Sequence, residues 1–309
     1  MVKLEPHSMA ENRSLRSESE QLDEVLRKLE AQREIKEISG WESGFPNLSR
    51  ALDGIFPGLY LLIGPPACGK TSFAKQLLDQ VAMRNGAPGI FFSFGENSHE
   101  LRTRTLSRLS GLENREIRRG SGYLLHWYGV PKGQHTETGS LPPGWEKLKK
   151  SAEDARIWLD RLYLVECGPE TGLPQIEAQI RELKSIKGTD RVMAVIDDCQ
   201  RLGNGRHKLI DRVAMVAELL QGAAVKLGIP LLGVWPDVLE DRASLPQIWS
   251  ERVPSADVIL VMEIDAERTK KLNEPNQALA LQIVKNRGGE KGKVGFEFYP
   301  AFSKFVEIN

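Results

Sequence analysis

The 309-residue chain has only three cysteines, Cys68, Cys167 and Cys199, and no two of them have C-x-x-C spacing. Neither a disulfide framework nor a zinc site is therefore expected, and this cysteine usage suits a reducing compartment. The sequence also lacks an apolar run of membrane-span length, and its charged N-terminus differs from a signal peptide. We therefore expect a cytoplasmic protein with no membrane partner.

Neither sign of charge is in excess. Lys and Arg together number 42, as do Asp and Glu, so the formal net charge is zero. This balance argues against a protein that is basic over its whole surface, although a local basic channel for nucleic acid remains open. With 40% hydrophobic residues, the chain can bury one large core, with or without an appendage.

A phosphate-binding pattern occupies residues 64–71, which read Gly-Pro-Pro-Ala-Cys-Gly-Lys-Thr. They match the G-x-x-x-x-G-K-[ST] form, with an apolar run at 59–63 before them and a helical pattern after them. A Gly/Pro-rich surface turn is the alternative, but the complete octamer between a strand and a helix argues against it. The pattern therefore predicts binding of a nucleoside triphosphate.

Phosphate binding explains the residue types found in this loop. Glycines let the backbone turn its N–H groups toward a phosphate at the start of a helix. Lys70 is expected to reach the β- and γ-phosphates and the Thr71 hydroxyl to hold Mg²⁺, so ATP and Mg²⁺ are the expected cofactors. The predicted nucleotide-binding residues of the loop are Gly64, Pro65, Pro66, Ala67, Cys68, Gly69, Lys70 and Thr71.

Strand and helix patterns alternate after Trp41. Buried parallel strands are predicted at 59–63, 89–94, 162–166, 192–197, 230–235 and 257–262. Helices are predicted at 98–110, 144–160, 174–187 and 208–227, and closing strands near 279–285, 293–299 and 303–307. The pattern indicates one α/β domain over 41–309, with a mainly parallel sheet and an antiparallel finish.

Two segments break this alternation. Residues 1–40 are expected to hold a disordered start and a helix over 21–38, whose apolar stripe covers its own domain or a neighbouring subunit. Residues 112–143 are expected to form an inserted loop with an aromatic patch over 123–128. Those aromatics could stack bases or cover the local core.

Two carboxylates follow predicted strands. Asp197 ends the apolar run 192–196, at the edge where open α/β sheets bind ligands, and is the candidate to hold Mg²⁺ through water. Its neighbour Asp198 is expected to point the other way. Glu96 follows the strand at 90–94 and could orient the attacking water or take its proton. Alternatively it is a helix N-terminal acid, a role that Glu100 fits better.

These pieces, in this order, resemble the C-terminal RecA-like ATPase domain of DnaB-type replicative helicases over about residues 41–309. The segments that carry the resemblance are 41–48, 96–104, 196–202, 255–261 and 283–292. The resemblance places Gln200 at the family's nucleotide-site glutamine. It also implies that Lys285 and Arg287, in a Lys-x-Arg-x-Gly hairpin, reach across a subunit boundary to the neighbour's γ-phosphate. A solvated hairpin tip is the alternative for these two residues.

The expected function is therefore a ring-forming ATPase, six subunits by resemblance, that moves on single-stranded DNA as a helicase. Arg206 and Lys208 lie in the position of the family's first DNA-binding loop, 238–252 is a second candidate, and a primase or a helicase loader is an implied partner. Trp235-Pro236 stands where the family carries Ser-Gln. That departure favours a KaiC- or RadA-like switch or recombination accessory, and a nucleotide-gated scaffold is a third reading.

Overall fold

The computed structural model describes residues 17–31, 38–120, 143–202, 209–236 and 245–308. The chain divides into two units, 1–37 and 38–309. In the first, helix α1 spans Glu18–Ala31, and Leu22, Val25 and Leu26 on its apolar stripe are exposed. Residues 32–37 of the predicted helix lie outside the described residues. Among the helices that are described, none combines the length and the apolar character needed to cross a membrane.

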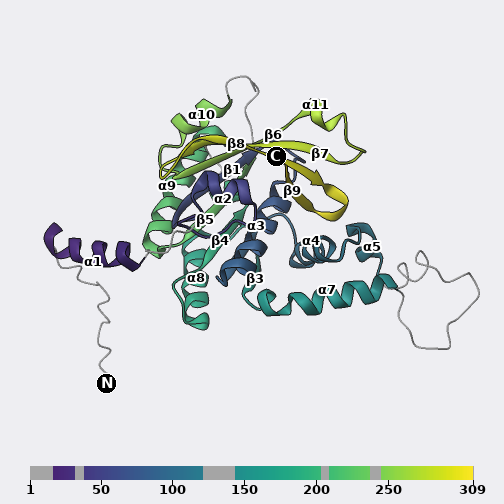
Figure 1. Ribbon diagram of the computed structural model, residues 1–309, viewed down its shortest axis with the longest axis horizontal. Coiled ribbons are helices and arrows are strands. Elements are labelled where there is room, and N and C mark those ends of the chain that lie inside the picture. The colour runs from purple at the N-terminus through teal and green to yellow at the C-terminus, as the bar shows by residue number, and fades with distance from the viewer. Residues whose placement is uncertain (1–16, 32–37, 121–142, 203–208, 237–244, 309) are drawn as a thin grey trace, which may run out of the picture. The chain divides into compact units, whose positions relative to one another are not determined.

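The second unit is built on a sheet whose strand order is β3-β2-β4-β5-β1-β6-β7-β8-β9 (Figure 1). The first six strands in this order pair in parallel and the last three antiparallel. This confirms the predicted sheet. The strands are β1 Gly58–Gly64, β2 Gly89–Ser93, β3 Leu162–Glu166, β4 Met193–Asp197, β5 Pro230–Pro236, β6 Val258–Ile264, β7 Gln277–Asn286, β8 Gly292–Tyr299 and β9 Lys304–Ile308.

Helices cover both faces of this sheet (Figure 1). The α-helices are α2 Pro46–Leu52, α3 Lys70–Asn85, α4 Ser98–Ser110, α5 Asn114–Arg119, α7 Pro143–Leu159, α8 Leu173–Lys187, α9 Leu209–Leu227, α10 Leu245–Arg252 and α11 Ala266–Thr269. Of the two 3₁₀ turns, η1 Cys199–Leu202 follows strand β4 and η3 Pro300–Phe302 connects strands β8 and β9.

Alternation along the strands divides the core into two layers. On β1, Leu62 packs in one cluster with Phe73 of α3, whereas the alternate residues Leu59, Leu61 and Ile63 join a second cluster with Leu220 of α9. Because successive side chains of a strand point to opposite faces, a continuous apolar run such as 59–63 serves both layers. The fully buried β1 is therefore held between α3 and α9.

Strand β9 is hydrogen-bonded to α3, the helix that follows the phosphate-binding loop. Gln76 of α3 donates from Nε2 to the Phe305 carbonyl at 2.9 Å, and the Phe305 N–H donates to Gln76 Oε1 at 2.8 Å. Two residues on, the Glu307 carboxylate accepts from the N–H groups of Asn47 and Leu48 at the start of α2. Strand β9 therefore anchors two helices that stand more than 200 positions earlier in the chain.

Local capping explains two differences from the predicted elements. Residues 114–119 were expected in the inserted loop but form α5, because Glu113 and Glu116 close a capping box at its start. Residues 245–252 of the second candidate DNA loop form α10, which buries Trp249 against the sheet. The remainder of the inserted loop, 121–142, and residues 237–244 lie outside the described residues.

Candidate active site

The carboxyl ends of the parallel strands bring the predicted site together at one edge of the sheet. Ser93 of β2 is in register with Asp197 of β4, and Ile63 of β1 is in register with Trp235 of β5. Residues 64–71 follow β1 directly, so the phosphate-binding loop and the Asp197 carboxylate share this edge. That is where open parallel sheets bind their ligands.

The loop has the backbone that a phosphate cradle needs. Ala67 and Gly69 have φ of 62° and 85°, in the left-handed region. A Cβ on Gly69 would come within 2.7 Å of the Phe298 ring, so only glycine fits there. Helix α3 then begins at Lys70 with no side-chain cap. Its first N–H groups are therefore suited to an anionic acceptor from outside the helix.

Lys70 folds back over the loop. Its Nζ donates to the carbonyl oxygens of Gly64 and Pro65 at 2.8 and 2.7 Å, so the ammonium is centred on the turn. Cys68 is fully buried and anchors the loop to the core. This leaves Pro66 and Ala67 at the exposed crest of the loop.

Thr71 and Asp197 are in contact, as the magnesium hypothesis requires. The Thr71 hydroxyl is hydrogen-bonded to the Asp197 carboxyl group, which is only 6% exposed. Burial raises the pKa of Asp197 to about 7, the Thr71 hydrogen bond opposes that rise, and the negative charges of Asp198 and Glu96 add to it. A cation placed here would therefore meet a buried carboxylate and a hydroxyl side by side.

The expectation that Asp198 points away from the site is wrong. Strand β4 ends at Asp197, so the alternation of strand side chains does not extend to the next residue. The Asp198 carboxyl group is hydrogen-bonded to that of Asp197 and accepts from Gln200 Nε2 at 3.2 Å. Gln200 therefore lies on η1 beside the acidic pair, at the same edge of the sheet.

Glu96 is held in place by a residue whose role the sequence did not reveal. Arg104 of α4 donates from Nε to Glu96 Oε2 at 2.9 Å and from its second terminal nitrogen to Oε1. It also donates to Ser72 Oγ of α3 at 2.7 Å. Arg104 thereby connects the carboxylate to the helix of the phosphate-binding loop. The sequence signal for Arg104 was its place in the segment 96–104 that carries the family resemblance, which did not indicate a contact with Glu96.

Glu96 does not cap helix α4. Asn97 is the N-cap residue and Glu100 completes the capping box, with the Glu100 N–H donating to Asn97 Oδ1 at 2.9 Å. Ser93 at the end of β2 braces the turn instead, since its hydroxyl donates to the Glu96 carbonyl and accepts from the Glu96 N–H. The Glu96 side chain is 26% exposed and does not cap the helix.

Lys285 and Arg287 lie at the opposite edge of the sheet. Asn286 at the end of β7 is in register with Val258, and Val258 with Tyr60 near the start of β1. Four residues of β1, about 13 Å of strand, separate Tyr60 from the loop. The two cations therefore cannot reach the phosphate-binding loop of their own chain.

Lys285 and Arg287 both contact groups of their own chain at this edge of the sheet. Lys285 Nζ donates to the Pro254 carbonyl at 2.6 Å, and burial, with the charge of Arg287, lowers the pKa of Lys285. Arg287 pairs with Asp257 at 2.8 Å while its side chain is 58% exposed. The predicted DNA-contacting residues Arg206 and Lys208 lie outside the described residues.

Comparison with known proteins identifies a family and several relatives of this chain. A family model described as the DnaB-like helicase C terminal domain matches residues 40–236. The replicative DNA helicase DnaB of Pasteurella multocida is 23% identical over 282 residues, covering 88% of this chain and 56% of that protein. The replicative DNA helicase DnaB of Geobacillus stearothermophilus is 26% identical, covering 88% and 57%. The chain thus spans little more than half the length of these relatives.

Solved structures share the fold. The ATPase domain of G40P superposes with a TM-score of 0.75 at 19% identity, over 96% of this chain and all of that one. A DnaB-like replicative helicase, solved in a study of its interactions with primase, gives 0.73 at 19% identity, over 95% and 69%. A KaiC-like protein from Pyrococcus horikoshii gives 0.52 at 16% identity, over 88% and 100%. The predicted RecA-like fold is therefore confirmed, and because the family model matches well over half of the chain, the chain belongs to the DnaB-like helicase C-terminal domain family.

Proposed function

We propose that the protein is a ring-forming ATPase that couples ATP hydrolysis to movement along single-stranded DNA, as a DnaB-like replicative helicase does. One observation carries the proposal. The phosphate-binding loop, Asp197 and Glu96 share one edge of the sheet, whereas Lys285 and Arg287 share the other. A site divided in this way is complete only where two copies meet head to tail.

Within one copy, the residues fit a magnesium nucleotide. The left-handed turns of the loop and the uncapped start of α3 offer N–H groups to phosphate oxygens. Bound Mg²⁺ would supply charge neutralisation at those oxygens, and Thr71 and Asp197 are the protein groups that would hold it. Lys70 would exchange its two carbonyl acceptors for phosphate. Gln200 would contribute to the nucleotide site from η1.

Glu96 would act on water. Its carboxylate follows β2, next to the strand of Asp197, and is partly exposed in a fixed orientation. A carboxylate so held can accept a hydrogen bond from the attacking water and take its proton. The paired hydrogen bonds from Arg104 fix the direction in which the carboxylate points.

The second copy would supply fixed positive charge. Lys285 and Arg287 would face the γ-phosphate of the neighbour, where negative charge develops as the phosphoryl group leaves. Within their own chain, Lys285 and Arg287 contact the Pro254 carbonyl and Asp257, and these contacts would orient the hairpin before two copies associate. A closed ring of such contacts, hexameric in this proposal, would pass DNA through a central channel that Arg206 and Lys208 would line.

A complementation experiment tests the divided site. Glu96→Gln copies lack the water-orienting group but keep the hairpin, and Arg287→Ala copies lack the hairpin cation but keep the loop. Each variant alone should have little ATPase activity, and a mixture should regain activity because some interfaces combine both intact halves. If the mixture stays as inactive as its parts, the divided site is wrong.

DNA coupling needs its own measurement. Single-stranded DNA should raise the ATPase rate of the assembled protein, and native mass should show one closed oligomer with nucleotide. A strand-displacement assay separates a helicase from a KaiC- or RadA-like switch. One observation favours the KaiC- or RadA-like switch. Trp235 near the end of β5 is fully buried and so offers no polar side chain to the nucleotide. ATP hydrolysis without displacement would favour that switch.

A further inference from the structure

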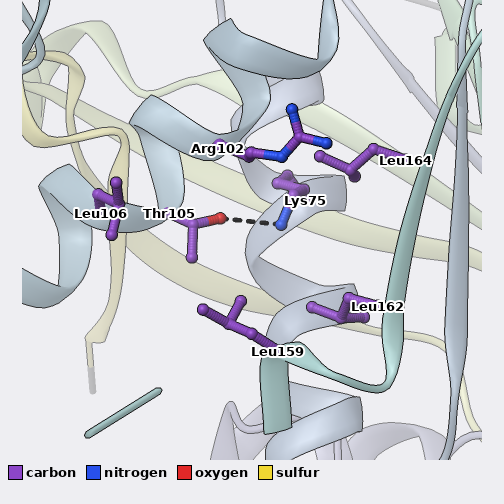
Figure 2. A pocket seen from close by; sticks show the side chains of 7 residues that line it. All are labelled: Lys75, Arg102, Thr105, Leu106, Leu159, Leu162 and Leu164. Carbon is purple, nitrogen blue, oxygen red and sulfur yellow. Dashed lines mark hydrogen bonds between the residues drawn. The ribbon is translucent and has the colours of Figure 1, made fainter. Parts of the chain in front are cut away.

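A cavity of about 200 Å³ lies beside helix α3 (Figure 2). Its walls come from α3, α4, the end of α7 and β3. Figure 2 shows Lys75 directed toward Thr105, with leucines around the two. The lining residues are Lys75, Arg102, Thr105, Leu106, Leu159, Leu162 and Leu164.

The cations beside this cavity outnumber their acceptors. Lys75 and Arg108 both pair with Asp79, which is the single carboxylate of this buried cluster. Asp79 Oδ1 accepts from Lys75, and Oδ2 accepts from Arg108 and from the Thr105 hydroxyl. Three donors therefore share the two Asp79 oxygens, and in the described residues Arg108 Nη1 is buried without a partner.

Lys75 itself has donor capacity to spare. Its side chain is 2% exposed, and its ammonium donates to Asp79 and, at 2.8 Å, to Thr105 Oγ1. An ammonium has three N–H donors, so one more acceptor can be accommodated. Burial is the largest cause of the lowered pKa of Lys75, and the charges of Arg108 and Arg102 lower it further. A negative group in the cavity would compensate this excess of positive charge.

The rest of the wall is apolar. Leu106, Leu159, Leu162 and Leu164 are each partly exposed around the cavity, and the Arg102 guanidinium is exposed beside it. We propose that this cavity binds a small organic carboxylate with an apolar tail, the carboxylate accepting from Lys75 and the tail packing on the leucines. An engineered cavity of about 150 Å³ holds benzene, so this one suits a ligand of about eight non-hydrogen atoms.

Hexanoate is the probe, used with the full-length protein. Isothermal titration should give a Kd on the order of 1 mM for a ligand of this size. The neutral isostere 1-hexanol, which keeps the tail, and acetate, which keeps the head, should each bind at least tenfold more weakly. Methyl NMR should show shifts at the four cavity leucines. Equal binding of hexanol and hexanoate would mean that only an apolar void is present, and shifts elsewhere would also overturn the proposal.

Substitutions test whether Lys75 binds the carboxylate of the ligand. Lys75→Met leaves one cation, Arg108, paired with one carboxylate, Asp79, so the variant should still fold. Its affinity for hexanoate should fall at least tenfold, while its affinity for hexanol should change less than twofold. Lys149→Met, at an exposed position on α7, is the matched control and should bind as the wild type. Leu106→Trp should fill the cavity and weaken both ligands, which keeps the test available if the first variant does not fold. Unchanged hexanoate affinity in the folded Lys75→Met variant would refute the site. None of these readouts depends on ATP hydrolysis.

Discussion

Arg104 donates to both carboxylate oxygens of Glu96 and, through the same guanidinium, to Ser72 on the helix of the phosphate-binding loop. The planar fork of arginine makes such a paired contact, whereas lysine offers a single point of charge. The orientation of Glu96 relative to the loop therefore depends on a residue eight positions downstream.

Arg104→Lys should lower kcat about 10- to 100-fold, because the carboxylate loses its fixed direction toward water. Nucleotide affinity should change less than threefold, since Glu96 does not hold the nucleotide in this proposal. Steady-state ATPase kinetics with nucleotide titration measure both. Arg156→Lys is the control, because it alters an exposed Arg–Glu pair on α7. A kcat equal to that of the wild type would show that Arg104 does not position Glu96.

Lys70→Ala should weaken nucleotide binding about 10- to 100-fold, the magnitude of a hydrogen bond to a charged group. The loop itself should keep its shape, because the left-handed residues Ala67 and Gly69 set its backbone. Equilibrium titration with a fluorescent ATP analogue measures the loss. Lys150→Ala, at an exposed position on α7, should bind as the wild type does. Retained affinity in Lys70→Ala would remove the phosphate role of the loop.

Asp79→Asn should destabilise the domain by about 3–5 kcal/mol, because it leaves Lys75 and Arg108 buried without a counter-charge. Both cations depend on this one carboxylate for their ion pairs. Urea unfolding followed by circular dichroism gives the free energy. Glu153→Gln, which breaks an exposed pair with Arg156, should cost less than about 1 kcal/mol. Similar losses in the two variants would contradict a buried charge cluster.

Stability should fall as pH rises from about 10 to 12, through Tyr60. Burial raises the pKa of this phenol to about 12, with help from the Asp257 carboxylate and against the hydrogen bond from Phe56. The folded chain thus keeps a proton that the unfolded chain releases near pH 10. Each pH unit in this window costs about 1.4 kcal/mol, so the contribution is complete below pH 10 and disappears toward pH 12.

Tyr60→Phe isolates that contribution. The variant cannot ionise, but it leaves the Phe56 N–H without its acceptor at 2.9 Å, so it should be about 1 kcal/mol less stable at neutral pH. Above pH 10 the difference between wild type and variant should shrink and then reverse. Parallel unfolding curves at all pH values would mean that Tyr60 does not titrate abnormally.

Local patterns in the sequence predicted most of this fold. The apolar runs gave the parallel strands because most of them are buried on both faces, although β3 at the edge of the sheet is only partly buried. The octamer at 64–71 identified the phosphate-binding loop. The direction of Asp198 was missed because alternation ends where β4 ends. Helix α10 was missed because the charged residues at and before its ends suggested a surface loop, whereas Trp249 is buried in the core.

Long-range geometry could not be predicted from local pattern. The placement of Arg287 opposite the loop follows from the register between β6 and β7, which no local residue pattern specifies. The pairing of Lys75 and Arg108 with one carboxylate likewise needs the packing of α3 against α4. Sequence reasoning therefore supplied the chemical groups, and the fold supplied their partners.

The hydrogen bonds between Gln76 and Phe305 have a consequence for biosynthesis. Residues 304–308 are synthesised after every other strand of this sheet, so helix α3 gains these two hydrogen bonds only after the rest of the sheet has left the ribosome. Chains that stop before this strand should consequently hold helix α3, and with it the phosphate-binding loop, less firmly.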